Sequence, residues 1–228
     1  MEFLVLKQPR VFPHQLLYRR AKRIFDIVLV VSTLPITLPI MCICALAIYH
    51  DSRGSIFFVQ ERIGKGGRLF RMYKFRTMQP DINIGDCQEY MQAYVRGEIS
   101  NGAENNHNGQ EVFKPVGSED IFRVGRFLRK ISLDELPQMI NVLKGDMSLV
   151  GPRPNVPWEV DAYSPWQHER LEVLPGITGL AQVRGRSCID FVSLVRNDIE
   201  YIEKQNFSLD LKIIWWTLNS FLRGKGAL

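Results

Sequence analysis

The longest apolar stretch of the chain runs from Ile27 to Tyr49 and contains 23 residues without a formal charge. A straight helix of this length would extend about 35 Å, which is enough to cross the hydrocarbon core of a bilayer. The stretch is too long for the apolar part of a cleaved signal peptide, and no small-residue cleavage pattern follows it. The pattern therefore predicts a membrane helix.

Two features argue against a simple crossing. Pro35 and Pro39 lie in the middle of the run, where each removes a backbone donor, so we expect a sharp bend. Basic residues stand on both sides of the run, namely Arg19, Arg20, Lys22 and Arg23 before it and Arg53, Arg62, Lys65 and Arg68 after it. Both ends therefore resemble cytoplasmic flanks. A re-entrant hairpin satisfies both observations, with Ser32 or Thr33 covering freed carbonyls; a kinked full crossing and a buried core helix are the alternatives.

The remaining pattern predicts few strands and many helices. Residues 56–59 and 69–75 read as two strands joined by the turn Gly64-Lys65-Gly66-Gly67, which makes a β-hairpin. Helical periodicity is present over residues 88–95, 124–143 (interrupted at Pro137), 158–173 and 190–204. Residues 101–110 are rich in Asn and Gly and are expected to form a surface loop. The fold class is therefore α+β and mainly helical.

The C-terminal segment, residues 209–222, is crowded with apolar side chains and carries Trp215 and Trp216 near Lys212 and Arg223. Paired tryptophans beside cations suit the lipid headgroup level, so an amphipathic interfacial helix is expected. A final helix packed on the protein's own core is the alternative. We divide the chain into a basic N-terminal segment with the membrane hairpin, residues 1–50, and a cytoplasmic globular domain that carries the chemistry, residues 51–228.

Charge is distributed unevenly. Residues 1–80 hold 13 Lys and Arg against 4 Asp and Glu, whereas residues 81–228 hold 16 against 20. Such a basic end suits nucleic acid, anionic lipid or phosphorylated ligands, and the adjoining apolar run favours membrane lipid over nucleic acid. With 46% apolar residues the chain can bury one main core. The four cysteines show neither zinc spacing nor a disulfide framework, so reduced thiols are expected.

The first chemistry-bearing pattern sets cations against adjacent carboxylates. Arg123, Arg126, Arg129 and Lys130 lead into Ser132-Leu133-Asp134-Glu135-Leu136-Pro137. Cations and a helix N-terminus both favour the charged form of a carboxylate, and an ionised Asp can attack phosphorus. Equally, Asp134 can be a helix N-cap, and Ser132 with Glu135 fits a capping box. From composition alone, the two roles of Asp134, nucleophile and helix N-cap, are equally well supported.

A second pattern favours phosphate chemistry. In Gly151-Pro152-Arg153-Pro154 two prolines hold an arginine in a stiff loop, and Arg suits bidentate phosphate contact. A structural turn with Arg153 in an internal ion pair is the alternative. Lys74 and Arg76 alternate along a strand, so both would project to one face and could contact phosphate, or simply form a solvated basic face.

These residues fall within ordered blocks that together resemble the bacterial sugar transferase family, the monotopic phosphoglycosyl transferases. The blocks cover most of residues 20–216 and are Lys22-Arg23-Ile24-Phe25-Asp26, Gln60-Glu61-Arg62-Ile63-Gly64, Lys74-Phe75-Arg76-Thr77-Met78, Val124-Gly125-Arg126-Phe127-Leu128-Arg129, Ser132 to Gln138, Asn141 to Pro154 and Pro175 to Leu180. Each block alone is weak, whereas the ordered set is specific. The chain departs from the family pattern at Leu34, where a Ser often precedes the proline, and at Ala181, where many members carry an aromatic residue.

The resemblance implies transfer of a sugar 1-phosphate from a UDP-sugar to polyprenyl (undecaprenyl) phosphate at the cytoplasmic face of the bacterial inner membrane. It implies that Asp134 is the nucleophile that forms a covalent phosphosugar intermediate, and that Glu135 is catalytic and binds Mg²⁺. It further implies substrate-binding roles for Lys74, Arg129 and Arg153. A homodimer in the membrane is also expected from the family.

Two other classes of function compete with this interpretation. One is a non-catalytic membrane-bound scaffold of polysaccharide assembly, and the other is a glycosyltransferase that moves only the sugar. Nothing in the sequence names the sugar, and both hexose and N-acetylhexosamine donors stay open. Residues 175–186 include Arg184 and Arg186 and are expected to form a strand or loop punctuated by Gly and Pro; this stretch is a candidate border of the donor site.

Overall fold

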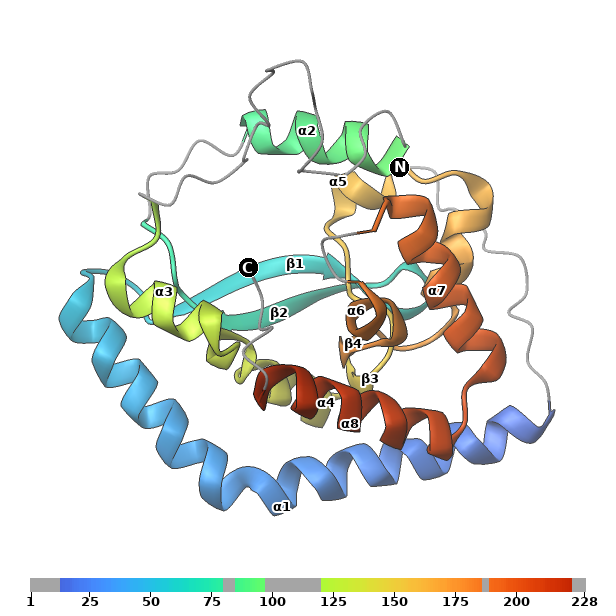
Figure 1. The fold of residues 1–228 in the computed structure, drawn as a ribbon, viewed down its shortest axis with the longest axis horizontal. Helices are drawn as coiled ribbons and strands as arrows, with labels where there is room; N and C mark the ends of the chain where they lie inside the picture. Colours follow the sequence, from blue (N-terminus) through green and yellow to red (C-terminus); the bar gives the residue numbers. More distant parts are fainter. Residues whose placement is uncertain (1–12, 80–84, 97–119, 186–188, 223–228) are drawn as a thin grey trace.

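The computed structural model describes residues 13–79, 85–96, 120–185 and 189–222. The loop expected at residues 101–110 and Arg186 lie outside these ranges. Within them the chain is mainly helical with two small sheets, which confirms the expected α+β class. Figure 1 shows one long bent helix along one side of the molecule, with the other elements gathered inside the bend.

The apolar run forms the long helix α1 (Pro13–Asp51), with 39 residues and both prolines inside it. Figure 1 shows the predicted bend, although the helix is continuous through it. The predicted hydroxyl bonds exist but reach other carbonyls than those the prolines free. Ser32 and Thr33 donate to Leu29 O, and Thr33 also to Val30 O. By length and composition α1 is long and apolar enough to cross a membrane; a re-entrant path stays a prediction.

Both arms of α1 pack on the same globular part. In the N-terminal arm, Lys22 pairs with Asp210 at 2.8 Å, and Val30 is buried in a cluster with Met72, Val142 and Met147. In the C-terminal arm, the buried residues Cys44 and Ile48 join a cluster with Phe75, Phe122 and Leu128. The helix is therefore part of the folding unit on either side of its bend.

The predicted β-hairpin is present. Strands β1 (Phe57–Ile63) and β2 (Leu69–Phe75) pair antiparallel, joined by the short 3₁₀ turn η1 (Lys65–Gly67). Gly66 and Gly67 have φ of 67° and 77°, a conformation that glycine adopts without a Cβ penalty. In a second sheet, β3 (Ser148–Val150) and β4 (Gly176–Thr178) pair in parallel. β4 lies where a strand or loop was expected, but β3 and the pairing were not predicted, because a three-residue strand carries too short a pattern.

Most helices lie where the sequence predicted them, but the short helix at residues 180–184 was not predicted. The helices after the hairpin are α2 (Gly85–Arg96), α3 (Arg123–Lys130), η3 (Leu133–Glu135), α4 (Gln138–Lys144), α5 (Pro157–Val160), η4 (Pro165–Glu172), α6 (Leu180–Arg184), α7 (Phe191–Lys204) and α8 (Phe207–Leu222). The predicted helix over residues 158–173 is wrong, because the chain forms α5 and then η4, which restarts at Pro165. The helical stretch expected over residues 124–143 is interrupted at Pro137 as predicted, and it is also broken at residues 131–132, so that it forms α3, η3 and α4.

The end of α1 organises the start of α3. Asp51 Oδ2 accepts a hydrogen bond from Val124 N at 2.8 Å, so a side chain of α1 caps the first turn of α3. Arg76, which follows β2, donates to the carbonyls of Ser52 at 2.9 Å and Arg53 at 3.0 Å. Arg76 is buried there, so the prediction that it shares a phosphate-binding or solvated face with Lys74 is wrong.

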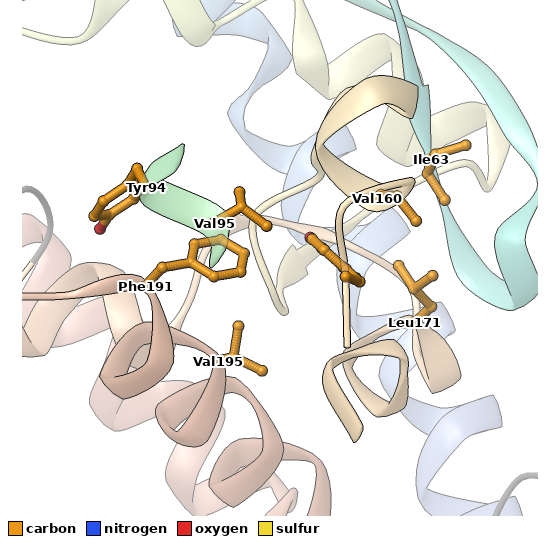
Figure 2. Packing of buried hydrophobic residues seen from close by; sticks show 8 residues of the cluster. Ile63, Tyr94, Val95, Val160, Leu171, Phe191 and Val195 are labelled. Atoms are coloured by element: carbon orange, nitrogen blue, oxygen red, sulfur yellow. The ribbon is translucent and has the colours of Figure 1, made fainter. Parts of the chain in front are cut away.

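One hydrophobic cluster joins the hairpin to the helices on the far side from α1. Figure 2 shows Ile63 of β1, Tyr94 and Val95 of α2, and Phe191 and Val195 of α7 converging. Val195 is fully buried. Tyr163, between α5 and η4, packs its ring on that of Phe191, with centroids 5.6 Å apart. This cluster surrounds a buried charged pair considered below.

Helix α8 packs on the core, as one of the two alternatives expected, and its position at a membrane interface stays a prediction. Its Asp210 and Ile213 are fully buried, so one face packs on the core. On the other face Trp215 is 66% exposed and Trp216 is 43% exposed. Exposed apolar side chains also follow α1 through its whole length, including Leu17, Ile24, Val28, Ile36, Ile43 and Leu46.

Candidate active site

The two adjacent carboxylates lie in η3, the single 3₁₀ turn between α3 and α4. Ser132 precedes the turn with a left-handed φ of 54°, and its hydroxyl makes no capping bond. The N-cap of α4 is Pro137 rather than Asp134. The capping box and the N-cap role are therefore wrong, and neither carboxylate is used to end a helix.

Two of the predicted substrate-binding cations donate hydrogen bonds to the same oxygen atom of Glu135. Its Oε1 accepts a hydrogen bond from Lys74 Nζ at 3.1 Å and from Arg153 Nη1 at 3.4 Å. Lys74 comes from β2 and Arg153 from the loop after β3, so residues 61 and 18 positions away reach one oxygen atom. The Lys74 side chain is only 14% exposed, and burial lowers its pKa while Glu135 opposes that shift.

Asp134 is half-buried and faces the same group of charges. Burial is the main cause that raises the pKa of Asp134, and the neighbouring Glu135 charge adds to it. Lys74, Arg129 and Arg153 act in the opposite direction, which places all three cations within electrostatic range of Asp134. The sequence suggested that cations and a helix end would set this pKa; the structure gives burial the larger effect.

Arg129 approaches from α3. Its Nε donates to Thr77 Oγ1 at 2.9 Å, which orients the guanidinium from the end of β2. Burial lowers the pKa of Arg129, and Asp134 is the charge that opposes this shift. The five residues predicted for the site, Asp134, Glu135, Lys74, Arg129 and Arg153, are thus brought together from α3, η3, β2 and one loop.

The loop that carries Arg153 requires its glycine. A Cβ added at Gly151 would lie 2.4 Å from Leu174 O, because the loop backbone touches the segment that leads into β4. The Arg153 side chain pairs with Glu135 at 3.4 Å, so the internal ion pair that the sequence left as the alternative is present, but 48% of the side chain stays exposed. The rigid loop thus presents a guanidinium that a ligand can reach.

A hollow of about 200 Å³ adjoins these side chains, bordered by cations and apolar groups. It is lined by Arg62, Met72, Lys74, Gln138, Arg153, Pro154, Gly176 and Ile177. Arg62 had no predicted role; its position within the block Gln60 to Gly64 was the only signal available from the sequence. The hollow is open to solvent, and the Arg62, Lys74 and Arg153 side chains of its lining suit contact with phosphate oxygens.

The number of potential ligand side chains in the site limits how a metal ion could be bound. Among the residues that the structure describes, no three acidic, histidine or cysteine side chains form a group. Mg²⁺ is often bound by one or two carboxylates, with substrate phosphates and water completing the coordination. Glu135, with Asp134 beside it, fits that mode and does not fit an all-protein cage.

Arg184, a candidate residue at the border of the donor site, makes its contacts with α7. Its guanidinium pairs with Glu200 of α7 and donates to Asn197 Oδ1 at 2.7 Å. These contacts link α6 to α7 on the surface. Arg184 is therefore not brought to the carboxylates.

Comparison with known proteins assigns the chain to a family. Residues 17–224 match the model described as "Bacterial sugar transferase". The chain is 40% identical over 208 residues to a galactosyl transferase, CpsE, of Streptococcus agalactiae, covering 91% of this chain and 43% of that protein. It is 39% identical to the undecaprenyl-phosphate galactose phosphotransferase of Salmonella typhimurium, covering 92% and 42%.

A third relative is matched over more of its length. It is the UDP-glucose:undecaprenyl-phosphate glucose-1-phosphate transferase of Caulobacter vibrioides, which is 39% identical over 90% of this chain and 71% of that protein. The chain spans less than half the length of the first two relatives. The match nevertheless includes α1, the hairpin, the carboxylates and α8. This chain belongs to the bacterial sugar transferase family.

Proposed function

We propose that this protein transfers a sugar 1-phosphate from a UDP-sugar to undecaprenyl phosphate, giving UMP and undecaprenyl-diphospho-sugar. The observation that carries the proposal is the placement of Asp134 beside Glu135 and within range of Lys74, Arg129 and Arg153. Three cations around two carboxylates leave a positive balance, which suits a diphosphate. Related proteins whose names describe transfer to undecaprenyl phosphate support the same reaction.

In the first proposed step an oxygen of ionised Asp134 attacks the β-phosphorus of the donor. The bond from that phosphorus to the oxygen shared with the α-phosphate breaks, and the electron pair leaves with UMP. Arg153 and Arg129 hold phosphate oxygens and offset their charge, which otherwise repels an anionic nucleophile. The product is an acyl phosphate ester between the sugar phosphate and Asp134.

In the second proposed step a phosphate oxygen of undecaprenyl phosphate attacks the same phosphorus. The bond to Asp134 breaks and restores the carboxylate, so the enzyme returns to its starting state. Neither step needs a general base, because both attacking oxygens are already ionised. Lys74 offsets charge and holds Glu135 by its hydrogen bond.

Glu135 is the proposed ligand of Mg²⁺. The bound ion would supply further positive charge to the phosphate oxygens of the donor. Lys74 and Arg153 both bond Oε1 of Glu135, which fixes the direction in which the carboxylate faces. We expect EDTA to stop UMP release and Mg²⁺ to restore it.

We propose that the protein is located in the bacterial inner membrane, with its active site at the cytoplasmic face. Both arms of α1 pack on one globular part, through Lys22 on one side and Ile48 on the other. A hairpin that enters and leaves a single leaflet keeps these contacts without placing protein on both sides. The exposed Trp215 and Trp216 of α8 suit the headgroup level, where the acceptor phosphate lies.

The test is to incubate the detergent-solubilised protein with a panel of UDP-sugars, undecaprenyl phosphate and Mg²⁺, and to measure nucleotide products. Release of UMP with formation of a lipid diphosphate sugar is the expected result. Release of UDP would show transfer of the sugar alone. Absence of turnover with every donor would support the alternative function, a non-catalytic membrane-bound scaffold.

The covalent intermediate needs a separate measurement. Without acceptor, a donor labelled at its β-phosphate should transfer label to the protein, and added radioactive UMP should exchange into UDP-sugar. Asp134→Asn should abolish both signals. A protein that releases UMP only when acceptor is present, with no exchange, would refute the two-step route.

A further inference from the structure

Behind the loop that carries Arg153 lies a buried ion pair with no role in the proposed chemistry. Arg170 of η4 is 2% exposed and Asp198 of α7 is 1% exposed, and Arg170 Nη2 donates to Asp198 Oδ2 at 2.6 Å. The guanidinium lies 5.8 Å from the ring centroids of both Tyr163 and Phe191. These rings belong to the hydrophobic cluster of Figure 2, so a full pair of charges is enclosed by apolar side chains.

The remaining donors of Arg170 reach toward the active-site loop. Nη2 also donates to the main-chain carbonyl of Arg153 at 3.1 Å. Nη1 donates to Asn155 Oδ1 at 2.8 Å and to Tyr163 Oη at 2.7 Å. One guanidinium thus connects α7 with two residues of the loop.

The loop is held on three successive carbonyls. Arg170 bonds Arg153 O, Arg62 Nη1 bonds Pro154 O at 3.0 Å, and Ile63 N bonds Asn155 O at 2.9 Å. The backbone at Arg153 is therefore fixed from η4 and from β1, while its side chain stays 48% exposed beside Glu135. Little freedom other than side-chain rotation remains for the Arg153 guanidinium.

A contribution to folding stability does not by itself explain why Arg170 and Asp198 are buried as an ion pair. Removing two charges from water is expensive, and apolar residues of similar size often stabilise a core as well as or better than a buried ion pair. Burial raises the pKa of Asp198 to about 6 despite the contact with Arg170, in accordance with that cost. What only an arginine supplies here is a planar set of donors that reaches a carbonyl, an amide oxygen and a hydroxyl together.

We propose that Arg170, held by Asp198, is a positioning residue for Arg153: it fixes the main chain at residue 153 so that the exposed guanidinium meets the donor diphosphate. This inference rests on the proposed function, in which Arg153 contacts phosphate. Arg170 itself touches no substrate and acts only through the loop. A displacement of about 1 Å at a substrate-orienting group can reduce the rate about 100-fold, so small shifts of the loop matter.

The test is a double-mutant cycle on kcat/KM for the UDP-sugar, which reports the donor half-reaction alone. Arg170→Lys keeps the charge that Asp198 needs but loses the planar set of donors, and we expect kcat/KM to fall roughly 10- to 100-fold. In an Arg153→Ala background the same change should have almost no further effect, because the group that Arg170 positions is absent. Asp198→Asn should give the same dependence on Arg153 and serves if Arg170→Lys does not fold.

The matched control is Val195→Ala, which opens a cavity in the same cluster without touching the loop. It should lower the thermal unfolding midpoint while kcat/KM for the donor stays within about twofold of wild type. Equal losses for Arg170→Lys with and without Arg153, or a folded Arg170→Lys protein with wild-type kcat/KM, would overturn the positioning role. A wild-type protein that releases no UMP from any donor would instead overturn the proposed function, and this inference with it.

Discussion

Replacement of Asp134 by Asn should change activity and donor affinity in opposite directions. The amide keeps the shape of the side chain but cannot form the phosphosugar ester, so UMP release should be lost. It also removes one of two negative charges that face Lys74, Arg129 and Arg153. The site becomes more positive, and a dianionic diphosphate should bind more tightly.

The size of the affinity change follows from Coulomb's law. In the donor complex the attacking oxygen lies about 3–3.5 Å from phosphorus, so the phosphate oxygens stand roughly 4 Å from the carboxylate. At an effective dielectric constant of 20 this repulsion is about 4 kcal/mol. Salt screening and the partial exposure of Asp134 reduce it to about 1–2 kcal/mol, which is roughly a 5- to 30-fold lower Kd.

Stability should change as well. Burial and Glu135 both disfavour the charge on Asp134, as the raised pKa indicates, so removing that charge should raise the unfolding midpoint by about 1–3 °C. The assays are UMP release, calorimetric titration with UDP-sugar, and thermal unfolding in detergent. Asp161→Asn, at an exposed acid of the globular part, is the matched control and should change none of the three.

Two results would refute this reasoning. Near-normal turnover by the Asp134→Asn protein would remove Asp134 from the nucleophile role. Lost turnover together with weaker donor binding would mean that the carboxylate attracts the donor, for example through a shared cation, and that the charge argument is wrong.

Three further predictions follow from the same structure. Activity should fall as pH falls through the pKa of Asp134, because the protonated carboxyl cannot attack, and since that pKa is raised, the acidic limb of kcat/KM should lie above the ordinary range near 3.8; a flat profile down to pH 4 would contradict this. Val142→Ala, at a fully buried residue packed with Val30 of α1, should lower the free energy of unfolding by about 1–3 kcal/mol, measured by denaturant titration. Brominated lipids should quench fluorescence in a protein that keeps only Trp215 and Trp216, and should leave a protein that keeps only Trp158 and Trp166 unquenched.

Local features of the sequence predicted much of the fold. The hairpin follows from alternating residues around Gly64 to Gly67, and α7 from its periodicity; the structure adds the N-cap Asp190, which accepts a hydrogen bond from Ser193 N at 2.8 Å. The two predicted carboxylates are neighbours in the chain, so their proximity required no tertiary information. The bend of α1 follows from its prolines.

What escaped prediction depends on contacts distant in sequence. Lys74 reaches Glu135 across 61 positions, and only the fold shows that Arg76, two residues later, bonds the main chain directly after α1. The pairing of β3 with β4 joins two three-residue segments that lie 28 positions apart in the sequence. Arg170 reads in the sequence as one more polar residue of an amphipathic helix, because periodicity carries no information about which charges are enclosed.

The hydrogen bond from Val124 N to Asp51 has a practical consequence for anyone who handles this protein. Asp51, the last residue of α1, thus caps the first turn of α3, and Arg129 lies on α3 five residues after Val124. Removing residues 13–51 to obtain a soluble fragment would therefore strip the cap from α3 and open the clusters around Val30 and Ile48. Helix α1 is therefore an integral part of the globular fold, and a truncation before residue 52 should disturb the position of Arg129.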